Sequence, residues 1–378
     1  MGRARATVFL IGLGAAWNAG NIGPVVGQVA GEFDVTLGQV GLMSGSLFCI
    51  GVSAAGFAGS WISERVSVIG GLRLCCFVCL AGNLLVAVAP DFWLALVARI
   101  LTGLGLGLAF LFGGVYARHE GGDKLIGLFG AGITLGIAFA LGIGGVMEDL
   151  GVDWRWAFVL SALVGASALP LLPRHSEAEA PKHEPLREVL AQAFTSSRFW
   201  RLQGIAIPAF SIPIVIGAWF VHYLVTEGDV APGAAGLIAF LVFACSAVSR
   251  DLGGQLLARG TPHGVLSMGG LGLGAAGIAV LALEPTVAGG LASAVLMGIG
   301  LSLPYAVVYD EGVRVLPESP VGGLGATQAT SNSFPIFVTP VLGTALASGD
   351  GTEAWLAVAA FVLLGGILNA RPAVPPEA

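Results

Sequence analysis

The sequence predicts an all-α integral membrane protein whose twelve transmembrane helices form two pseudo-symmetric six-helix bundles. Of the 378 residues, 56% are hydrophobic and only 11% are charged, and the mean hydropathy is +0.88. Soluble domains carry about 25% charged residues. The apolar residues also fall into segments of about 20 residues, which is the length that a membrane-spanning helix requires. The basic residues lie almost entirely at alternate connections between these segments.

The first half of the chain contains six apolar segments. Windows of about nineteen residues place these segments at 7–30, 39–61, 69–89, 92–117, 125–147 and 154–173. A polar stretch at 174–199 follows, with charges of alternating sign and with Pro181 and Pro185. We therefore expect an N-terminal bundle at 1–173 and a linker at 174–199.

The second half repeats this count of six. Its apolar segments lie at 200–225, 234–257, 264–283, 287–310, 323–346 and 353–370, which predicts a C-terminal bundle at 200–378. Pro304, Pro335 and Pro340 fall inside the fourth and fifth of these segments. Because proline removes a backbone hydrogen bond, it can act as a hinge in a spanning helix.

Charge placement predicts the orientation. Of the 17 Lys and Arg residues, Arg99 and Arg250 lie within predicted spans, Arg155 lies in a connection on one side, and all the others lie on the opposite side. Cytoplasmic connections hold the excess of basic residues. We therefore expect a multi-pass protein of a bacterial inner membrane, with both termini and the linker in the cytoplasm. The short basic start before an uninterrupted apolar run indicates a first span, not a removed signal peptide.

Other features of the composition argue for packing and against cofactors. The five cysteines all lie in apolar segments, and Cys76 and Cys79 lack a second pair of ligands, so we expect neither disulfides nor a metal centre. The 59 glycines lie largely inside apolar segments, where small residues allow close helix packing. No basic patch points to nucleic acid. A monomer in the lipid bilayer is the expected state.

Polar residues recur with a period of three helices. The third, sixth, ninth and twelfth predicted spans have almost no polar interior, Asn83 being the main exception. The first, fourth, seventh, tenth and eleventh spans do have polar residues in their interior. Helices that line a water-filled cavity need polar side chains, so we expect these spans to surround a central polar cavity. The predicted substrate-binding residues are Asn18, Asn21, Arg99, Trp219, His222, Tyr305, Gln328 and Asn332.

A short motif connects the second and third spans. It reads Gly59-Ser-Trp-Ile-Ser-Glu64-Arg65, with Arg73 at the start of the next helix, and Gly253 and Arg259 repeat its spacing in the second half. This connection resembles the Gly-x-Leu-Ala-Asp-Arg loop of the major facilitator superfamily. Glu replaces Asp in the first copy, and Ala258 takes the acidic position in the second. The pattern suits a gate, because an acidic and a basic residue on a rim can pair in one conformation and separate in another.

Two further stretches extend this resemblance over essentially the whole chain. Arg99-Ile-Leu-Thr-Gly103 is similar to the family's Arg-x-x-x-Gly helix pattern, and Trp154-Arg-Trp-Ala-Phe158 to its Trp-Arg-Trp-x-Phe. The resemblance implies the major facilitator fold and an internal duplication. A charge such as Arg99 near the membrane interior costs about 2.5 to 3.5 kcal/mol and usually serves function. The alternative is structural pairing of Arg99 with a backbone carbonyl, Asn18 or Asn21. Trp154 and its neighbours are expected to anchor a helix end.

Arg250 and Asp251 are candidates for ion coupling in the eighth span. Asp251 is a candidate proton carrier, because burial favours the protonated form of a carboxylate. A structural ion pair is the alternative. His222 suits either a pH-sensitive gate or a membrane-interface position. Asp310 and Glu311, near Arg314, are interpreted as a solvated cytoplasmic rim.

These features together predict a secondary transporter. The chain has no phosphate-binding Gly-x-x-x-x-Gly-Lys-[Ser/Thr] loop and no His-Glu-x-x-His pair, so we expect neither a nucleotide-driven pump nor an enzyme. Arg99 as the main central charge favours an anionic or neutral polar organic solute, with protons or a counter-solute as the further partner. The alternative is a proton-coupled efflux antiporter for drugs and other amphipathic compounds, with Asp251 as its carrier. Leu141 stands where the exporter motif has proline.

Overall fold

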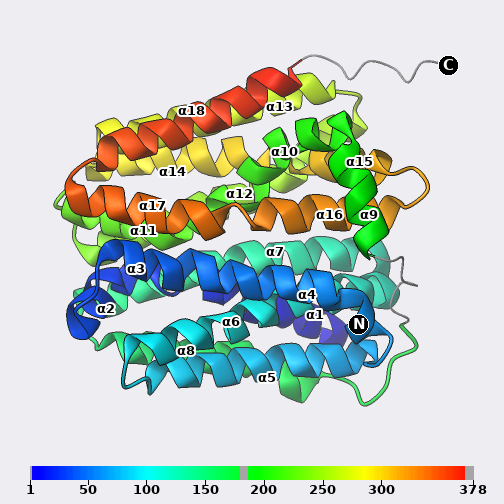
Figure 1. The fold of residues 1–378 in the computed structure, drawn as a ribbon, viewed down its shortest axis with the longest axis horizontal. Coiled ribbons are helices and arrows are strands. Elements are labelled where there is room, and N and C mark those ends of the chain that lie inside the picture. Colours follow the sequence, from blue (N-terminus) through cyan, green and yellow to red (C-terminus); the bar gives the residue numbers. More distant parts are fainter. Residues whose placement is uncertain (1, 179–185, 371–378) are drawn as a thin grey trace.

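The computed structural model describes residues 2–178 and 186–370, and the described chain is helical with no strand. The first half comprises eight helices, which form the lower body in Figure 1. They are α1 (Gly2–Ala16), α2 (Val26–Phe33), α3 (Leu37–Gly41), α4 (Leu47–Ser63), α5 (Val68–Ala87), α6 (Phe92–Leu108), α7 (Gly114–Asp149) and α8 (Trp154–Ala166).

The second half forms the upper body in Figure 1. Its helices are α9 (Leu186–Thr195), α10 (Ser197–Phe210), α11 (Ile212–Thr226), α12 (Pro232–Ala258), α13 (His263–Leu283), α14 (Val287–Ser302), α15 (Tyr305–Val315), α16 (Pro320–Asn332), α17 (Pro335–Ser348) and α18 (Gly351–Asn369). The predicted linker therefore contains one helix, α9, which packs on α16.

Twelve spans are confirmed. Eleven helical stretches of the described chain are long and apolar enough to cross a membrane. The remaining span consists of α16 and α17, which are separated only at Ser333 and Phe334. Each predicted range overlaps one of these spans, with ends that differ by a few residues. The bundle boundaries at 173 and 200 stay a prediction.

The helices that carry the predicted site are interrupted, whereas α5, α13 and α18 are continuous. The first span changes to a tighter 3-10 turn at Trp17–Ala19, and the fourth contains a wider turn at Ala109–Gly113. The seventh span breaks at Ser211, between α10 and α11, and the tenth breaks between α14 and α15. Discontinuous helices of this kind occur around the binding sites of membrane transport folds.

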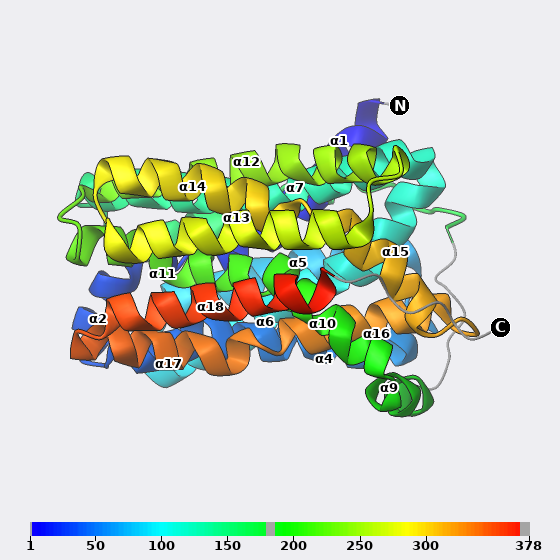
Figure 2. The same cartoon turned by 90° about the horizontal axis from the view of Figure 1, so that it is seen from above.

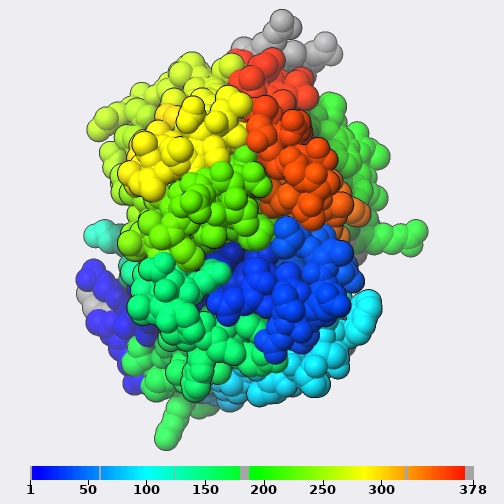
Figure 3. All heavy atoms as spheres, turned by 90° about the vertical axis from the view of Figure 1, so that its left-hand side faces the viewer, coloured from blue at the N-terminus to red at the C-terminus, as the bar shows by residue number. Residues whose placement is uncertain are grey.

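The molecule has two unlike ends. We call the end where α1 begins and α18 ends the basic end, and the opposite end, with the α2–α3 and α17–α18 connections, the distal end (Figure 1). At the distal end the two halves are in contact: Thr339 Oγ1 donates a hydrogen bond to the Gly41 carbonyl at 2.9 Å. A Cβ placed on Gly23 would lie 2.2 Å from the Gly217 carbonyl oxygen, so only glycine permits this crossing. Figure 3 shows the distal face filled by atoms of both halves.

The helices α7 and α12 of the two halves pack on each other. These helices lie side by side in Figures 1 and 2, and the rings of Phe139 and Phe240 pack in their distal parts with centroids 5.4 Å apart. Asp251 is three helical turns beyond Phe240 on the same face of α12, yet it is exposed. A Cβ on Gly254 would meet nothing within 4 Å. The two halves are therefore in contact at the distal end, whereas the surface of α12 at Asp251 and Gly254 is open at the basic end.

Candidate functional site

Arg99 lies in the interior of the first half, with no exposed surface. Its Nε donates to the Met43 carbonyl at 3.0 Å, its Nη2 to the Asn18 carbonyl at 2.7 Å and its Nη1 to Asn21 Oδ1 at 3.3 Å. Its guanidinium also lies 4.9 Å from the ring centroid of Phe48. No carboxylate is paired with it among the described residues. These contacts agree with the alternative that Arg99 pairs structurally with backbone carbonyls, Asn18 and Asn21. A solute-binding role for Arg99 stays a prediction.

Asn18 and Asn21 extend this buried network. Asn83 Nδ2 donates to Asn18 Oδ1 at 2.7 Å, and Asn21 Nδ2 donates to Ser161 Oγ at 3.0 Å. The network joins the first span to α5, α6 and α8, and it gives Asn83 a partner in a span that is otherwise apolar. The three residues predicted together from sequence do lie together, but in this conformation their polar groups are directed at one another.

The second half holds a different cluster, around the break between α14 and α15. The Arg250 guanidinium lies over the Tyr305 ring, with its Cζ 4.1 Å from the ring centroid. The Tyr305 and Tyr309 hydroxyls lie 3.1 Å apart, and the Phe210 ring packs edge-on against both tyrosines. Within the described chain Arg250 has no hydrogen-bond partner, and its Nε is buried without one. We call Phe210, Arg250, Tyr305 and Tyr309 the aromatic cluster.

Asp251 is not buried, although its predicted role as a proton carrier depends on burial. Its side chain is exposed and accepts a hydrogen bond of 2.7 Å from Gln255 Nε2. It makes no ion pair with Arg250, because adjacent residues point about 100° apart on a helix. The burial on which the prediction rested is therefore missing in this conformation, and the coupling role of Asp251 stays a prediction without that support.

The other predicted binding residues are spread over the second half. Trp219 is fully buried near the distal end, where its Nε1 donates to the Thr339 carbonyl at 3.0 Å and its ring centroid lies 6.0 Å from that of His222. Gln328 is partly exposed and Asn332 is buried, both on α16. The structure thus brings Trp219 and His222 together, but neither belongs to the aromatic cluster.

The motif residues lie at the basic end, as expected from their resemblance. Glu64 and Arg65 form an exposed ion pair at 3.6 Å with each other, and Arg73 Nη2 donates to the Pro173 carbonyl at 2.9 Å. Gly253 lies at a close crossing with α14, whereas Arg259 is exposed at the end of α12. Gly59 lies within α4, but its surroundings are outside the described part. The gating roles stay predictions.

Glu32 is a partner that sequence reasoning missed at the distal end. Trp154 Nε1 donates to Glu32 at 2.5 Å, and Arg155 forms an ion pair with the same carboxylate. Trp154 is buried, whereas Trp156 is 60% exposed. The Trp-Arg-Trp stretch therefore fastens α8 to α2 as well as presenting one ring to the surroundings.

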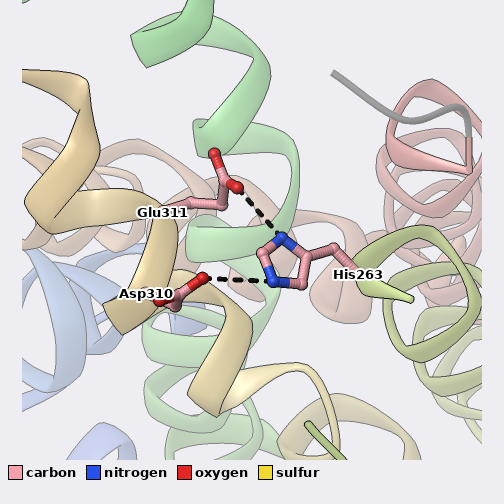
Figure 4. Close-up of side chains that lie close together, drawn as sticks. All are labelled: His263, Asp310 and Glu311. Atoms are coloured by element: carbon pink, nitrogen blue, oxygen red, sulfur yellow. Dashed lines mark hydrogen bonds and ion pairs between the residues drawn. The ribbon is translucent and has the colours of Figure 1, made fainter. Parts of the chain in front are cut away.

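Sequence reasoning also missed a cluster of charged side chains around His263. His263 lies between two carboxylates of α15 at the basic end (Figure 4), with Nδ1 2.9 Å from Glu311 Oε1 and Nε2 3.1 Å from Asp310 Oδ2. Arg198 Nη2 pairs with Glu311 Oε2 at 2.8 Å, and Arg314 pairs with Asp310 at 2.9 Å. Asp310 is 29% exposed and pairs with the exposed Arg314, as a rim position predicts, whereas the Glu311 side chain is only 15% exposed. No local sequence motif could predict this cluster, because His263 and Asp310 are 47 positions apart.

Twelve apolar spans, interrupted inner helices and two similar halves define a polytopic membrane protein of the transporter fold. The Major Facilitator Superfamily profile matches residues 8–340, and the chain belongs to this family.

Curated relatives match only part of the chain. One is the facilitated glucose transporter member 8 of solute carrier family 2 from Bos taurus, 32% identical over 132 residues, which are 34% of this chain and 27% of the relative. Another is the galactose-proton symporter of Escherichia coli K12, 27% identical over 172 residues, which are 41% of this chain and 36% of the relative. The chain thus matches about a third of the length of these relatives.

Solved structures match almost the whole chain. A bacterial homologue of the human lysosomal transporter Spinster, in an inward-facing and unoccupied conformation, has a TM-score of 0.75 at 18% identity over 97% of this chain and 95% of that one. A D-xylose-proton symporter has a TM-score of 0.75 at 16% identity over 97% and 96%. At these identities the likeness concerns the fold.

Proposed function

We propose that this protein is a secondary transporter that moves a small anionic or neutral polar organic solute by alternating access. Family membership supports this function, and so does the inequality of the two ends. A carrier of this kind needs two halves that can close at one end while they part at the other. In our proposal the basic end faces the cytoplasm of a bacterium, so that this conformation is inward-facing.

The observation that carries the proposal is the unpaired guanidinium of Arg250. A buried donor without a partner costs about 1–3 kcal/mol, and the cost disappears when a ligand oxygen accepts the hydrogen bond. Arg250 presents such donors beside the hydroxyls of Tyr305 and Tyr309. Arg99 by contrast already donates to three acceptors. We therefore assign solute binding first to the aromatic cluster.

Two solute chemistries suit this cluster. A carboxylate would accept two parallel hydrogen bonds from Arg250. A polyhydroxylated neutral solute would use the same donors through its oxygens and would pack its C–H surface on the Phe210 and Tyr305 rings. The names of the relatives, a glucose transporter, a galactose-proton symporter and a polyol transporter, favour the neutral class.

The proton-coupled drug antiporter is not favoured by any observation on Asp251, whose side chain is exposed. Coupling to protons or to a counter-solute remains part of our proposal, since relatives are named proton symporters. We also propose that the unit is a monomer in the inner membrane.

Exchange in proteoliposomes tests the proposal. Vesicles containing purified protein are preloaded with hexoses, pentoses, polyols or small carboxylates, and entry of the labelled solute is measured in counterflow. We expect one solute class to exchange, and Arg250→Ala to lower exchange about tenfold or more, which corresponds to losing about 1.4 kcal/mol of binding. Arg187→Ala is the matched control, because Arg187 is exposed on α9. Absence of exchange for every solute, under counterflow and under a pH gradient, would contradict the proposal.

The variant Arg250→Lys separates the two chemistries. Lysine keeps the charge but lacks the planar fork of donors. Transport of an anion should be partly retained, whereas a neutral solute that needs two aligned donors should lose affinity to a similar extent in Lys and Ala variants.

A further inference from the structure

The short helix α15 carries residues of both clusters in the second half. Tyr305 and Tyr309 belong to the aromatic cluster, whereas the next two residues, Asp310 and Glu311, contact His263. A break at Leu303 and Pro304 separates α15 from α14, so its backbone is not continuous with the rest of its span. Proline is among the usual causes of a sharp kink between two helical segments, so α15 and α14 are joined at a point where their angle can change.

The geometry around His263 fits a protonated ring. Both ring nitrogens are within hydrogen-bond distance of a carboxylate oxygen, and the two carboxylates lie at opposite nitrogens (Figure 4). A neutral imidazole has one N–H donor and one acceptor lone pair, whereas an imidazolium has two donors. Only the protonated form of His263 can therefore donate to Asp310 and Glu311 at once.

Charges of both signs surround His263. The carboxylates of Asp310 and Glu311 on α15 lie at its two ring nitrogens. Arg198 of α10 and Arg314 of α15 already pair with these carboxylates, and Arg201 of α10 lines the same pocket, so three cations oppose a fourth. From α18 the pocket receives the uncharged Asn369.

The pocket itself also offers a route for the proton. It encloses about 50 Å³ between α10, α13, α15 and α18 and is lined by His263, Glu311 and Ser267 among others. The Ser267 hydroxyl is fully buried and lacks a partner within the described chain. A cavity of this size with polar groups in its lining can hold a water molecule, which would satisfy Ser267 and reach His263 and Glu311.

We propose that His263 is a proton-binding site that clamps α15 to α13 and α10 when it is protonated and releases α15 when the proton leaves. We call His263, Asp310 and Glu311 the clasp. Because α15 also carries Tyr305 and Tyr309, the pH at the basic end would set the position of the aromatic cluster. This last consequence rests on the proposed function, whereas the clasp itself does not.

Distance measurements between spin labels test the clasp without any solute. One label replaces Val313, exposed on α15, and the other replaces Leu368, exposed near the end of α18, in protein whose native cysteines are substituted. Between about pH 5.5 and about pH 8.5, a range that spans ordinary imidazole titration, we expect the ratio of displaced to clamped distances to rise about tenfold, equivalent to about 1.4 kcal/mol.

Two variants and one control complete the test. His263→Lys keeps a cation and should stay clamped at every pH, whereas His263→Gln should be displaced at every pH. His175→Gln, at an exposed histidine, should titrate like the wild type. Wild-type distances that do not change with pH would overturn the proposal. So would pH dependence that survives in His263→Gln, or clamping at fixed pH that a chelator abolishes, since a bound cation and not a proton would then hold α15.

Discussion

At the scale of single residues, Arg99 and Arg250 illustrate two ways in which a membrane protein accommodates a central arginine. Arg99 gives its donors to two carbonyls and one side-chain amide in the first half. Arg250 instead rests on the Tyr305 ring and keeps donors unused. A charge in low dielectric must be compensated somehow. The arrangement of Arg99 stabilises the N-terminal bundle, whereas the arrangement of Arg250 leaves hydrogen-bond donors available for a ligand.

Replacing Arg99 with Gln should therefore lower stability before it alters solute recognition. Gln is too short to reach the acceptors of Arg99, so the carbonyls of Met43 and Asn18 lose their donor inside the bundle. Each buried group left unpaired costs about 1–3 kcal/mol, and we expect a loss of about 3 kcal/mol or more in the free energy of unfolding. Thermal unfolding in detergent measures it.

Arg65→Gln is the control, because Arg65 is exposed and surface changes usually stay within about 0.5 kcal/mol. An Arg99→Gln protein that unfolds like the wild type but no longer transports would contradict the structural role and favour binding.

The sequence allowed Asn18 and Asn21 to be predicted as partners of Arg99, because both are polar residues in the interior of the first span. It did not allow us to predict whether these side chains face a solute cavity or one another, because that depends on how each helix is rotated about its axis. The clasp was beyond reach for another reason. His263 and Glu311 meet only through the packing of α13 on α14 and the turn at Pro304.

At the scale of elements, prolines predicted where two spans break. Pro304 and Pro335 each lie next to an interruption, as expected from the lost backbone hydrogen bond. Pro340 does not end a helix and lies inside α17, where its Cα would be 2.6 Å from a Cβ placed on Gly41 of α3. Proline alone therefore does not determine the position of a break. The wider turns at Leu42–Ser46 and Ala109–Gly113 contain no proline and had no sequence signal.

Gly253 and Gly254 provide a matched pair for helix packing. A Cβ on Gly253 would lie 2.1 Å from the Leu303 carbonyl oxygen, whereas a Cβ on Gly254 would meet nothing within 4 Å. We expect Gly253→Ala to force α12 and α14 apart and to destabilise the protein by about 1–3 kcal/mol, the usual cost of overpacking. Gly254→Ala should be neutral or stabilising by up to about 1 kcal/mol.

Unfolding of the two variants in the same detergent measures the difference. Equal stability of the two proteins would show that α14 yields at this crossing, and the close approach seen at Gly253 would then have no energetic importance.

At the scale of the whole molecule, the described ion pairs all join residues of the same half. Contacts between the halves are instead made by backbone carbonyls, hydroxyls and apolar side chains at the distal end, such as the hydrogen bond from Ser46 Oγ to the Ile336 carbonyl. Interfaces of this kind can part without leaving unpaired charges. The duplication and the twelve spans followed from periodicity and charge placement, but the conformation could not, because both states of a carrier must be encoded by one sequence.

Cysteine pairs at the two ends should report this conformation. A Cβ on Gly142 would lie 3.3 Å from the Cβ of Phe240, close to the roughly 3.5–4.5 Å that a disulfide spans. In protein without native cysteines, Gly142→Cys with Phe240→Cys should therefore oxidise readily, as measured by loss of maleimide labelling. The disulfide should hold the distal end closed and stop solute exchange until a reductant is added.

The matched pair is Ala131→Cys with Asp251→Cys, eleven residues away on each helix and therefore about three turns nearer the basic end. In the proposed inward-facing conformation α7 and α12 part there, so this pair should stay reduced while the distal end is closed. It should oxidise only when the molecule turns over to the opposite state, so a solute that drives exchange should accelerate its formation. Rapid oxidation of both pairs in the absence of solute would mean that the halves do not part between α7 and α12, and the inward-facing assignment would fail.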